Sequence, residues 1–381
     1  MAKSKKRRRK MGSIDYGVFY AVIVLLAIGI VMVYSASSYY AMFHDGNDST
    51  AYLKKQLAAS VLGMIAMFFF MSFDYHKIKK YTVPLMVVTI PLLLVVRLFP
   101  AINGAQRWIP LGPFGTFQPS ELAKYVVVFF LAMSISAKGD GIKEFGTGIV
   151  PYIGISGFYA GLVLMQKNLS IAALIMIVTF IVLFSAGGRL KHLFLYVAPV
   201  LVSAALVFAL GEEYRRDRML NFLNPWEDAA DKGYQLIQSF YALGAGGITG
   251  LGLGQSRQKT LYMPEPHNDF IFSIIGEELG LIGCVVIIAL FLILIWRGVK
   301  VSMEARDTYG TLLALGITSV IAVQAIINIA VVTGSMPVTG VPLPFISYGG
   351  TSLAITMAAM GILLNISRQK ESGIENILLE K

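Results

Sequence analysis

Long apolar runs separated by polar connections dominate this chain of 381 residues. A helix needs about 20 apolar residues to cross the hydrocarbon core of a bilayer, because each residue adds only ~1.5 Å along the helix axis. Runs of roughly this length occur at residues 16–38, 54–73, 80–99, 119–137, 149–165, 169–187, 190–210, 269–296, 308–332 and 348–367. The pattern predicts an all-α integral membrane protein, a bundle of ten transmembrane helices forming a single polytopic membrane domain over residues 1–381.

Composition agrees with this prediction. Hydrophobic residues make up 56% of the chain and charged residues only 14%, whereas a soluble globular protein carries about a quarter charged residues. A net charge of +10 would suit nucleic acid. However, a group of basic residues precedes the first apolar run, as Lys3, Lys5, Lys6, Arg7, Arg8, Arg9 and Lys10. That placement is typical of an anchor against anionic lipid, so nucleic acid is not expected as a partner.

The basic residues also predict the orientation in the membrane. Ten crossings put both termini on one side, and the connections on that side hold most of the 32 Lys and Arg residues. The positive-inside rule therefore makes residues 1–15 a basic cytoplasmic tail and residues 368–381 a second cytoplasmic tail.

Three connections on the opposite, outer side are long enough to carry function: residues 100–119, 211–268 and 333–347. The largest, 211–268, is predicted to be a large extracellular loop between helices 7 and 8. Long loops in compact proteins are usually functional or disordered. The apolar-rich middle of this loop, residues 234–243, predicts one or two short amphipathic helices at the membrane surface.

Positive charge and glycine gather in the large loop. Residues 244–254 are rich in glycine, which lets a backbone expose its N–H groups to an anion. The segment lacks the Lys-Ser/Thr ending of a nucleotide-binding loop, so an extracellular phosphate is the expected guest. Arginine forks also suit phosphate, although the first three arginines could equally contact lipid headgroups. The cations concerned are Arg215, Arg216, Arg218, Arg257 and Lys259.

Glu121 and Lys124 stand at the outer start of the fourth run, three residues apart. Charges within membrane spans are costly, and this spacing lets the two neutralise each other on one helix face. Two interpretations stay open. The pair is either a structural ion pair that fixes helix packing, or Lys124 faces an outward cavity and contacts an anionic ligand.

The segment before the eighth run places Glu265, His267 and Asp269 close together in sequence. Asp269 stands where an N-cap is expected, and its spacing leaves capping and chemistry equally open. His267 has no histidine neighbours with metal-ligand spacing, so a dedicated zinc site is not predicted. Glu277 and Glu278, two turns further on, are expected to hold the helix to its neighbours.

Several motifs follow one another in an order that resembles a known family. They are Gln-Pro-Ser-Glu-Leu-Ala-Lys (118–124), Asn-Pro-Trp-Glu-Asp (224–228), a glycine-rich stretch (250–259), Pro-Glu-Pro-His-Asn-Asp-Phe-Ile-Phe (264–272) and Pro-Leu-Pro-Phe-Ile-Ser-Tyr-Gly-Gly (342–350). Together they resemble the SEDS family of FtsW, RodA and SpoVE. The Asn-Pro-Trp motif and the basic tail are most similar to the FtsW/SpoVE branch.

The resemblance implies a ten-helix peptidoglycan glycosyltransferase of the bacterial cytoplasmic membrane, acting in cell division or sporulation. Its substrate would be lipid II, the undecaprenyl-pyrophosphate-linked disaccharide pentapeptide. Its partners would be a class B penicillin-binding protein and other division or sporulation membrane proteins. The family's catalytic carboxylate corresponds to Asp269, its helix-borne pair to Glu121 and Lys124, and its loop tryptophan to Trp108. Where the family often has Gln-Pro-Asp, this chain has Gln-Lys-Asn, so Asn168 is interpreted as a turn residue or polar contact.

The chemistry is consistent with these residues. A sugar hydroxyl that attacks a pyrophosphate-linked anomeric carbon needs one base, worth roughly 10² to 10⁴ in rate. The leaving pyrophosphate needs positive charge, so the two acids of a glycoside hydrolase are not required. Asp269 is the predicted base, with His267 and Glu265 in support. Lys124 and the loop cations are candidate pyrophosphate ligands, and Mg²⁺ or Mn²⁺ is a candidate helper; no covalent cofactor is expected.

Two rival functions remain: a lipid II flippase, and a non-catalytic scaffold for a penicillin-binding protein. Transporters bind their substrates near the bilayer midplane. Here the polar, Gly- and Arg-rich segments lie in outer loops instead, which favours the enzyme. A scaffold would leave Asp269 unexplained.

Overall fold

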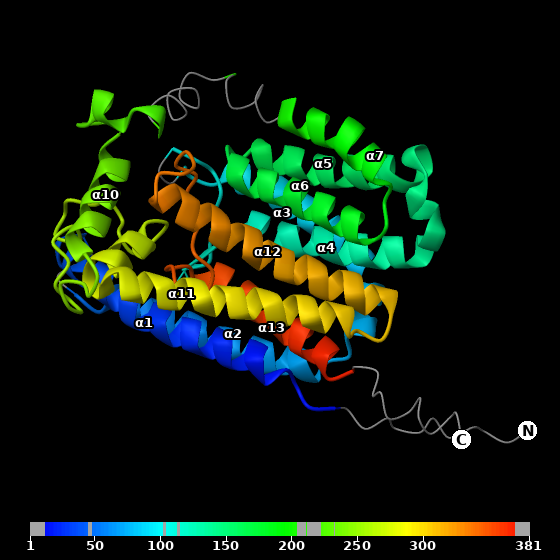
Figure 1. Ribbon diagram of the computed structural model, residues 1–381, viewed down its shortest axis with the longest axis horizontal. Coiled ribbons are helices and arrows are strands. Elements are labelled where there is room, and N and C mark those ends of the chain that lie inside the picture. Colours follow the sequence, from blue (N-terminus) through cyan, green and yellow to red (C-terminus); the bar gives the residue numbers. More distant parts are fainter. Residues whose placement is uncertain are drawn as a thin grey trace, which may run out of the picture.

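The computed structural model describes residues 12–44, 48–101, 104–112, 115–203, 211, 222–231 and 233–369 as an elongated bundle of helices (Figure 1). The long helices run broadly along one direction. α10 and several loops gather at one end of the bundle, and α1 begins and α13 finishes at the opposite end. These two ends are called the loop end and the terminal end.

The chain forms helices at nearly every predicted run. Their bounds are α1 (Tyr16–His44), α2 (Ala51–Ser72), α3 (Ile78–Val95), α4 (Pro119–Lys138), α5 (Val150–Leu164), α6 (Leu169–Ser185), α7 (Leu190–His192), α10 (Tyr234–Gly246), α11 (Ile271–Met303), α12 (Thr308–Val332) and α13 (Gly350–Ser367). Short 3₁₀ turns cover Tyr75–Lys77, Val96–Leu98, Gly139–Lys143 and Pro225–Asp228, and π-helical turns cover Phe145–Ile149 and Leu193–Val197. The α10 helix confirms the helix predicted within the large loop.

Within the described ranges, eight helices are long and apolar enough to cross a membrane. Two further apolar helices, Leu169–Ser185 and Leu190–Ser203, are shorter. The chain is therefore a multi-span, mostly helical membrane protein. The seventh predicted run ends in residues 204–210, which lie outside the described residues.

Burial separates the central helices from those that face outwards. The spans containing α4, α12 and α13 are 67%, 72% and 67% buried, whereas those of α2, α3 and α11 are only 28%, 22% and 28% buried. Most exposed residues in the middle of the outer helices are themselves apolar, as Val87 and Leu292 illustrate. Helices that are apolar all round are what a lipid environment requires. The three central helices therefore form the framework on which the site is built.

The two ends of the described chain meet at the terminal end. The backbone N–H of Gly12 donates to the carbonyl of Arg368 at 2.9 Å. Asp15 forms an ion pair with Arg297 of α11 at 2.6 Å, and its N–H donates to Ser367 of α13. The first and last described residues therefore lie at the same end of the bundle, and the cytoplasmic placement of the two tails stays a prediction.

Two local features depart from the prediction. The eighth run is not one continuous helix from 269 to 296, because α11 starts at Ile271 and breaks at Gly280, where φ is +66° and ψ is −165°. Residues 100–119 contain a small antiparallel hairpin in which β1 (Ile109–Pro110) pairs with β2 (Thr116–Phe117). A hydropathy pattern cannot reveal the break or the hairpin, because it reports how apolar the side chains are and not which φ and ψ angles the backbone adopts.

Candidate functional site

Asp269 lies at the loop end, in the turn that leads into α11, and its side chain is partly buried. Its backbone carbonyl accepts a hydrogen bond from the amide of Asn328 in α12 at 2.7 Å. Its carboxylate lies beside Gly340, because a Cβ added to that glycine would be 3.7 Å from Asp269 Oδ2. The residue before α11 is Phe270, which makes no side-chain cap. The N-cap interpretation of Asp269 is therefore wrong.

His267 packs among aromatic rings. Its side chain is buried, and its ring centroid lies 4.3 Å from that of Tyr52, 5.4 Å from Tyr348 and 5.5 Å from Tyr40. The carbonyl of His267 also accepts from the N–H of Tyr348 at 2.9 Å. These contacts join α1, α2 and the segment before α13. The turn that carries Asp269 is thereby fixed on one side.

Glu265 stands three residues from Asn268 and accepts a hydrogen bond from its amide at 2.7 Å. Its φ of +45° lies in a region that L residues adopt rarely. The same short segment thus holds Glu265 and Asp269, although a supporting role of Glu265 or His267 in chemistry stays a prediction.

The Glu121–Lys124 pair is buried in the centre of the bundle. Lys124 Nζ donates to Glu121 Oε2 and to Gln324 Oε1 of α12, each at 2.8 Å. The Ser352 hydroxyl of α13 donates to the same Glu121 oxygen. The side-chain exposures are 0% for Lys124 and 2% for Glu121. Of the two interpretations left open, these contacts favour a structural ion pair that ties α4 to α12 and α13.

The glycine-rich segment packs against the broken turn of α11. Four backbone hydrogen bonds join the two: Leu251 N–H to Glu277 O, Gly252 N–H to Glu278 O, Leu281 N–H to Gly247 O and Ile282 N–H to Ile248 O. The glycines permit this close approach. A Cβ on Gly246 would lie 1.9 Å from Gly276 O, and one on Gly280 would lie 2.3 Å from Gly250 N. The glycines therefore serve backbone packing here, which the phosphate-cradle interpretation did not foresee.

Glu277 and Glu278 complete this arrangement, which is called the glycine clamp and comprises residues 244–259 and 276–282. Glu277 accepts from the N–H of Arg257 at 2.9 Å and from the Ser256 hydroxyl. Glu278 accepts from Ser35 of α1 at 2.7 Å. Both glutamates are fully buried. The prediction that they hold the helix to its neighbours is confirmed.

The two cations of the clamp differ. Lys259 is buried, and its Nζ lies 2.8 Å from Glu278 Oε1 and 3.1 Å from Ser35 Oγ. Arg257 is exposed, and no ion pair among the described residues includes its guanidinium. As pyrophosphate ligands both stay predictions. The exposed guanidinium of Arg257 offers its positive charge to a pyrophosphate directly, whereas Lys259 would have to share its charge with Glu278.

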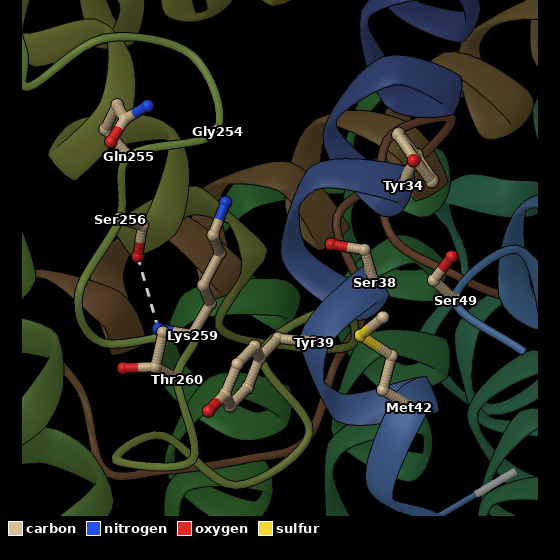
Figure 2. A pocket seen from close by; sticks show the side chains of 10 residues that line it. All are labelled: Tyr34, Ser38, Tyr39, Met42, Ser49, Gly254, Gln255, Ser256, Lys259 and Thr260. Atoms are coloured by element: carbon tan, nitrogen blue, oxygen red, sulfur yellow. Dashed lines mark hydrogen bonds between the residues drawn. The ribbon is translucent and has the colours of Figure 1, made fainter. Parts of the chain in front are cut away.

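A groove of about 450 Å³ separates the clamp from α1 (Figure 2). Figure 2 shows the Lys259 side chain between the loop and α1, with the Ser256 hydroxyl bonded to the Lys259 backbone nitrogen. The groove is lined by Tyr34, Ser38, Tyr39, Met42, Ser49, Gly254, Gln255, Ser256, Lys259 and Thr260. Asp269 does not line it, so the structure does not bring all predicted site residues together.

Lys54, a further cation at the start of α2, takes part in an exposed ion pair. A hydrogen bond from Lys54, together with bonds from Thr50, holds the pKa of Asp48 well below its usual range. Asp48 is therefore ionised at neutral pH and pairs with Lys54 at 2.8 Å. This turn stands next to Ser49 at the rim of the groove.

Trp108 precedes the small hairpin and is partly buried. Its neighbour Arg107 donates to the backbone carbonyls of Gln166 and Lys167 in the turn between α5 and α6. In that turn Asn168 is the N-cap of α6, where it accepts from the N–H of Ile171 at 3.2 Å. The interpretation of Asn168 as a local polar contact is confirmed. A role for Trp108 in substrate binding stays a prediction.

Several predictions concern residues or groups for which the structure offers no test. Arg215, Arg216 and Arg218 lie outside the described residues. Among the described residues, no group of three His, Cys, Asp or Glu side chains is placed to hold a metal ion. The Mg²⁺ or Mn²⁺ helper stays a prediction.

Sequence reasoning missed Gln324 and Asn328, which contact Lys124 and Asp269 respectively. Both stand in the apolar run 308–332. Polar side chains within a membrane span are functional candidates by default. That rule would have singled them out had it been applied to amides as well as to charges.

The fold and site define a polytopic helical membrane protein with a buried ion pair in its centre and a partly buried carboxylate at its loop end. Residues 16–372 match the family model of cell cycle proteins named for FtsW, RodA and SpoVE. The chain belongs to this family, as its motifs predict.

Relatives match along most of the chain. Stage V sporulation protein E of Bacillus subtilis (strain 168) is 44% identical over 94% of this chain and 98% of its own length. The probable peptidoglycan glycosyltransferase FtsW of Geobacter sp. (strain M18) is 42% identical with the same coverage. A solved chain from a peptidoglycan synthase complex that coordinates polymerization and crosslinking has a TM-score of 0.78 and 28% identity, covering 94% of this chain and 99% of that one.

Proposed function

We propose that this protein is a peptidoglycan glycosyltransferase that polymerises lipid II into glycan strands for cell division or sporulation. The observation that carries the proposal is its 42% identity, over nearly the full length, to a protein named as a probable peptidoglycan glycosyltransferase. Asp269 supports it, because a partly buried carboxylate at one end of the bundle suits a general base.

The proposed reaction is one displacement at an anomeric carbon. The 4-hydroxyl oxygen of one sugar forms a bond to C1 of the donor sugar while the bond from C1 to the pyrophosphate oxygen breaks. The hydroxyl proton passes to Asp269, and undecaprenyl pyrophosphate leaves with the electron pair. Attack from the face opposite the leaving group inverts the α-linked donor into a β-linked product.

The leaving pyrophosphate needs positive charge as it departs. Among the described cations, exposed Arg257 suits this role best, because its guanidinium can bind two phosphate oxygens at once. Arg215, Arg216 and Arg218 are further candidates from the large loop. A Mg²⁺ or Mn²⁺ ion needs only one or two protein carboxylates besides substrate phosphates, so Asp269 or Glu265 could help to hold one.

The same proposal covers placement in the membrane. We infer ten crossings, with the two shorter apolar helices completing the eight longer ones, in a single membrane domain. The terminal end carries Lys77, Lys138, Arg189, Lys191, Arg306 and Arg368, so the positive-inside rule makes it cytoplasmic and puts Asp269 on the outer face. The match to a chain from a synthase complex supports a crosslinking partner, proposed as a class B penicillin-binding protein.

The decisive experiment compares Asp269→Asn with the parent protein in a lipid II polymerisation assay. Both are purified in detergent and tested alone and with the partner. We expect the rate to fall by roughly 10² to 10⁴, because amide nitrogen cannot take the proton. Asp307→Asn makes the same chemical change at the N-cap of α12, at the terminal end. It is expected to keep the parent rate per folded molecule.

Two outcomes would overturn parts of this proposal. Normal polymerisation by Asp269→Asn would show that the base is another group. No polymerisation by the parent, even with its partner present, would favour the flippase or the scaffold.

A further inference from the structure

Two buried amides project from α12 one helical turn apart. Gln324 and Asn328 are 2% and 1% exposed, and a spacing of four places them on the same face of the helix. Burying an amide among apolar helices is unfavourable unless its polar atoms find partners. The contacts of these two side chains therefore indicate their role.

Gln324 connects the central ion pair to the segment before α13. Its Oε1 accepts from Lys124 Nζ at 2.8 Å, and its Nε2 donates to the carbonyl of Pro342 at 3.0 Å. The amide orientation follows from chemistry alone, because an ammonium only donates and a carbonyl only accepts.

Asn328 connects the same segment to Asp269. Its Nδ2 donates to the carbonyl of Asp269 and to the carbonyl of Val341, each at 2.7 Å. Turning the amide over would point its oxygen at two carbonyl oxygens, so this orientation is also fixed. The cost is visible, because the buried Asn328 Oδ1 has no hydrogen-bond partner among the described residues. A residue kept only to fill space would avoid that cost.

The two amides together form one continuous path of contacts. It runs from Glu121 through Lys124 and Gln324 to residues 341–342, and from there through Asn328 to Asp269. Gly340, which faces the Asp269 carboxylate, directly precedes this anchored pair. Asn328 thus holds both the residue that carries the carboxylate and the strand of chain beside it.

We propose that Asn328 is a positioning residue for Asp269, and that Gln324 ties this position to the buried Glu121–Lys124 pair. The inference rests on the proposed function, in which Asp269 takes a proton from the acceptor hydroxyl. Displacement of a reacting group by about 1 Å can cost 10²-fold in rate without any change in the chemical groups present. The central ion pair then affects catalysis from a distance, with no contact to substrate.

The test measures kcat and KM for lipid II in Asn328→Leu, which has similar volume but no donor. We expect kcat to fall by about 10²-fold, with KM unchanged within about threefold. Asn328→Gln keeps the donors one methylene further out, so it should recover part of the lost kcat. A purely structural role would lower the amount of folded protein and leave kcat per folded molecule unchanged.

Asn365→Leu is the matched control. Asn365 is also a fully buried asparagine in a central helix, and its amide donates to the carbonyl of Met71 at 2.9 Å, at the terminal end. It should lower the melting temperature by a similar amount while keeping kcat. If Asn328→Leu fails to fold, Asn328→Gln alone decides: parent kcat in that variant, despite the displaced donors, would overturn the inference.

Gln324→Leu tests the second half of the path. We expect a smaller fall in kcat, about tenfold, and a double variant with Asn328→Leu that falls less than the product of the two. Strict multiplication would show that the two amides act separately and would overturn the coupling. Failure of the proposed function looks different, because Asp269→Asn would then keep activity or the parent would have none.

Discussion

Two acidic sites lie close together in sequence at the loop end of α11, and they differ in structure. Glu277 and Glu278 in the glycine clamp are fully buried, and their oxygens accept hydrogen bonds from Ser35, Ser256 and the backbone of Arg257. Asp269, two turns earlier, is only partly buried. The oxygens of the two glutamates are thus used in contacts within the protein. The comparison supports a structural role for the glutamates, while proton transfer by the aspartate stays the proposal made above.

The largest expected effect on stability comes from breaking the buried Glu278–Lys259 pair. Glu278→Gln leaves the ammonium of Lys259 without its counter-charge, which typically costs about 3–5 kcal/mol in a buried pair. We expect a lower melting temperature and a parent rate per folded molecule. The comparison variant is Asp140→Asn, which breaks an exposed pair with Lys143 and should change little.

The double variant Glu278→Gln/Lys259→Met sharpens the same comparison. Removing both charges should restore most of the lost stability, since no uncompensated charge remains. If its stability returns while its polymerisation rate per folded molecule falls below that of the parent, Lys259 contacts the substrate, and the clamp belongs to the active site.

A smaller effect is expected at the break in α11. Gly280→Ala puts a Cβ 2.3 Å from Gly250 N at a φ of +66°, so the clamp must open. A backbone with positive φ and ψ near −165° is essentially restricted to glycine and costs about 1–3 kcal/mol for a residue with a Cβ, and the steric clash adds to it. Gly254→Ala also places a Cβ at a positive φ (+80°) but meets nothing within 4 Å, so it tests such a substitution without the steric clash. Equal melting temperatures for the two variants would contradict the close packing described for the clamp.

The smallest predicted effect concerns Arg257, the exposed cation of the clamp. Arg257→Gln should lower kcat/KM for lipid II by up to about fivefold, because an exposed ionic contact contributes roughly 1 kcal/mol or less. Its melting temperature should match the parent. Arg306→Gln removes an exposed arginine at the terminal end and should leave both quantities unchanged. An unchanged kcat/KM in Arg257→Gln would show that Arg257 does not contact the leaving pyrophosphate.

Much of the fold could be predicted because hydropathy reports directly on burial in lipid. The positions of most helices, including α10, followed from that pattern. The contacts of the site could not be predicted in the same way. Lys259 pairs with a glutamate 19 residues away, and Ser352 reaches Glu121 across 231 residues. No local periodicity encodes such partners.

Glycine was the residue type most open to misinterpretation. In sequence, residues 244–254 suggest a backbone that waits for an anion. In the structure, the N–H groups of Leu251 and Gly252 donate to carbonyls of α11. A glycine-rich stretch shows only that two backbones approach closely, and sequence alone does not say whether the second belongs to a ligand or to the protein. Family motifs single out Asp269 in the sequence, whereas only the structure gives the contacts of Gln324 and Asn328.

The break at Gly280 bears on which part of α11 crosses the hydrocarbon core of the membrane. The most apolar 18-residue window of residues 271–303 has a mean hydropathy of 3.1, the highest among the eight long helices of the described ranges. After the break, residues 281–303 are roughly 35 Å long at ~1.5 Å per residue, which is enough to cross a ~30 Å hydrocarbon core. The stretch before the break, with both buried glutamates, can therefore remain in the interfacial layer. A crossing made by residues 281–303 alone would keep the costly charges of both glutamates out of the hydrocarbon core.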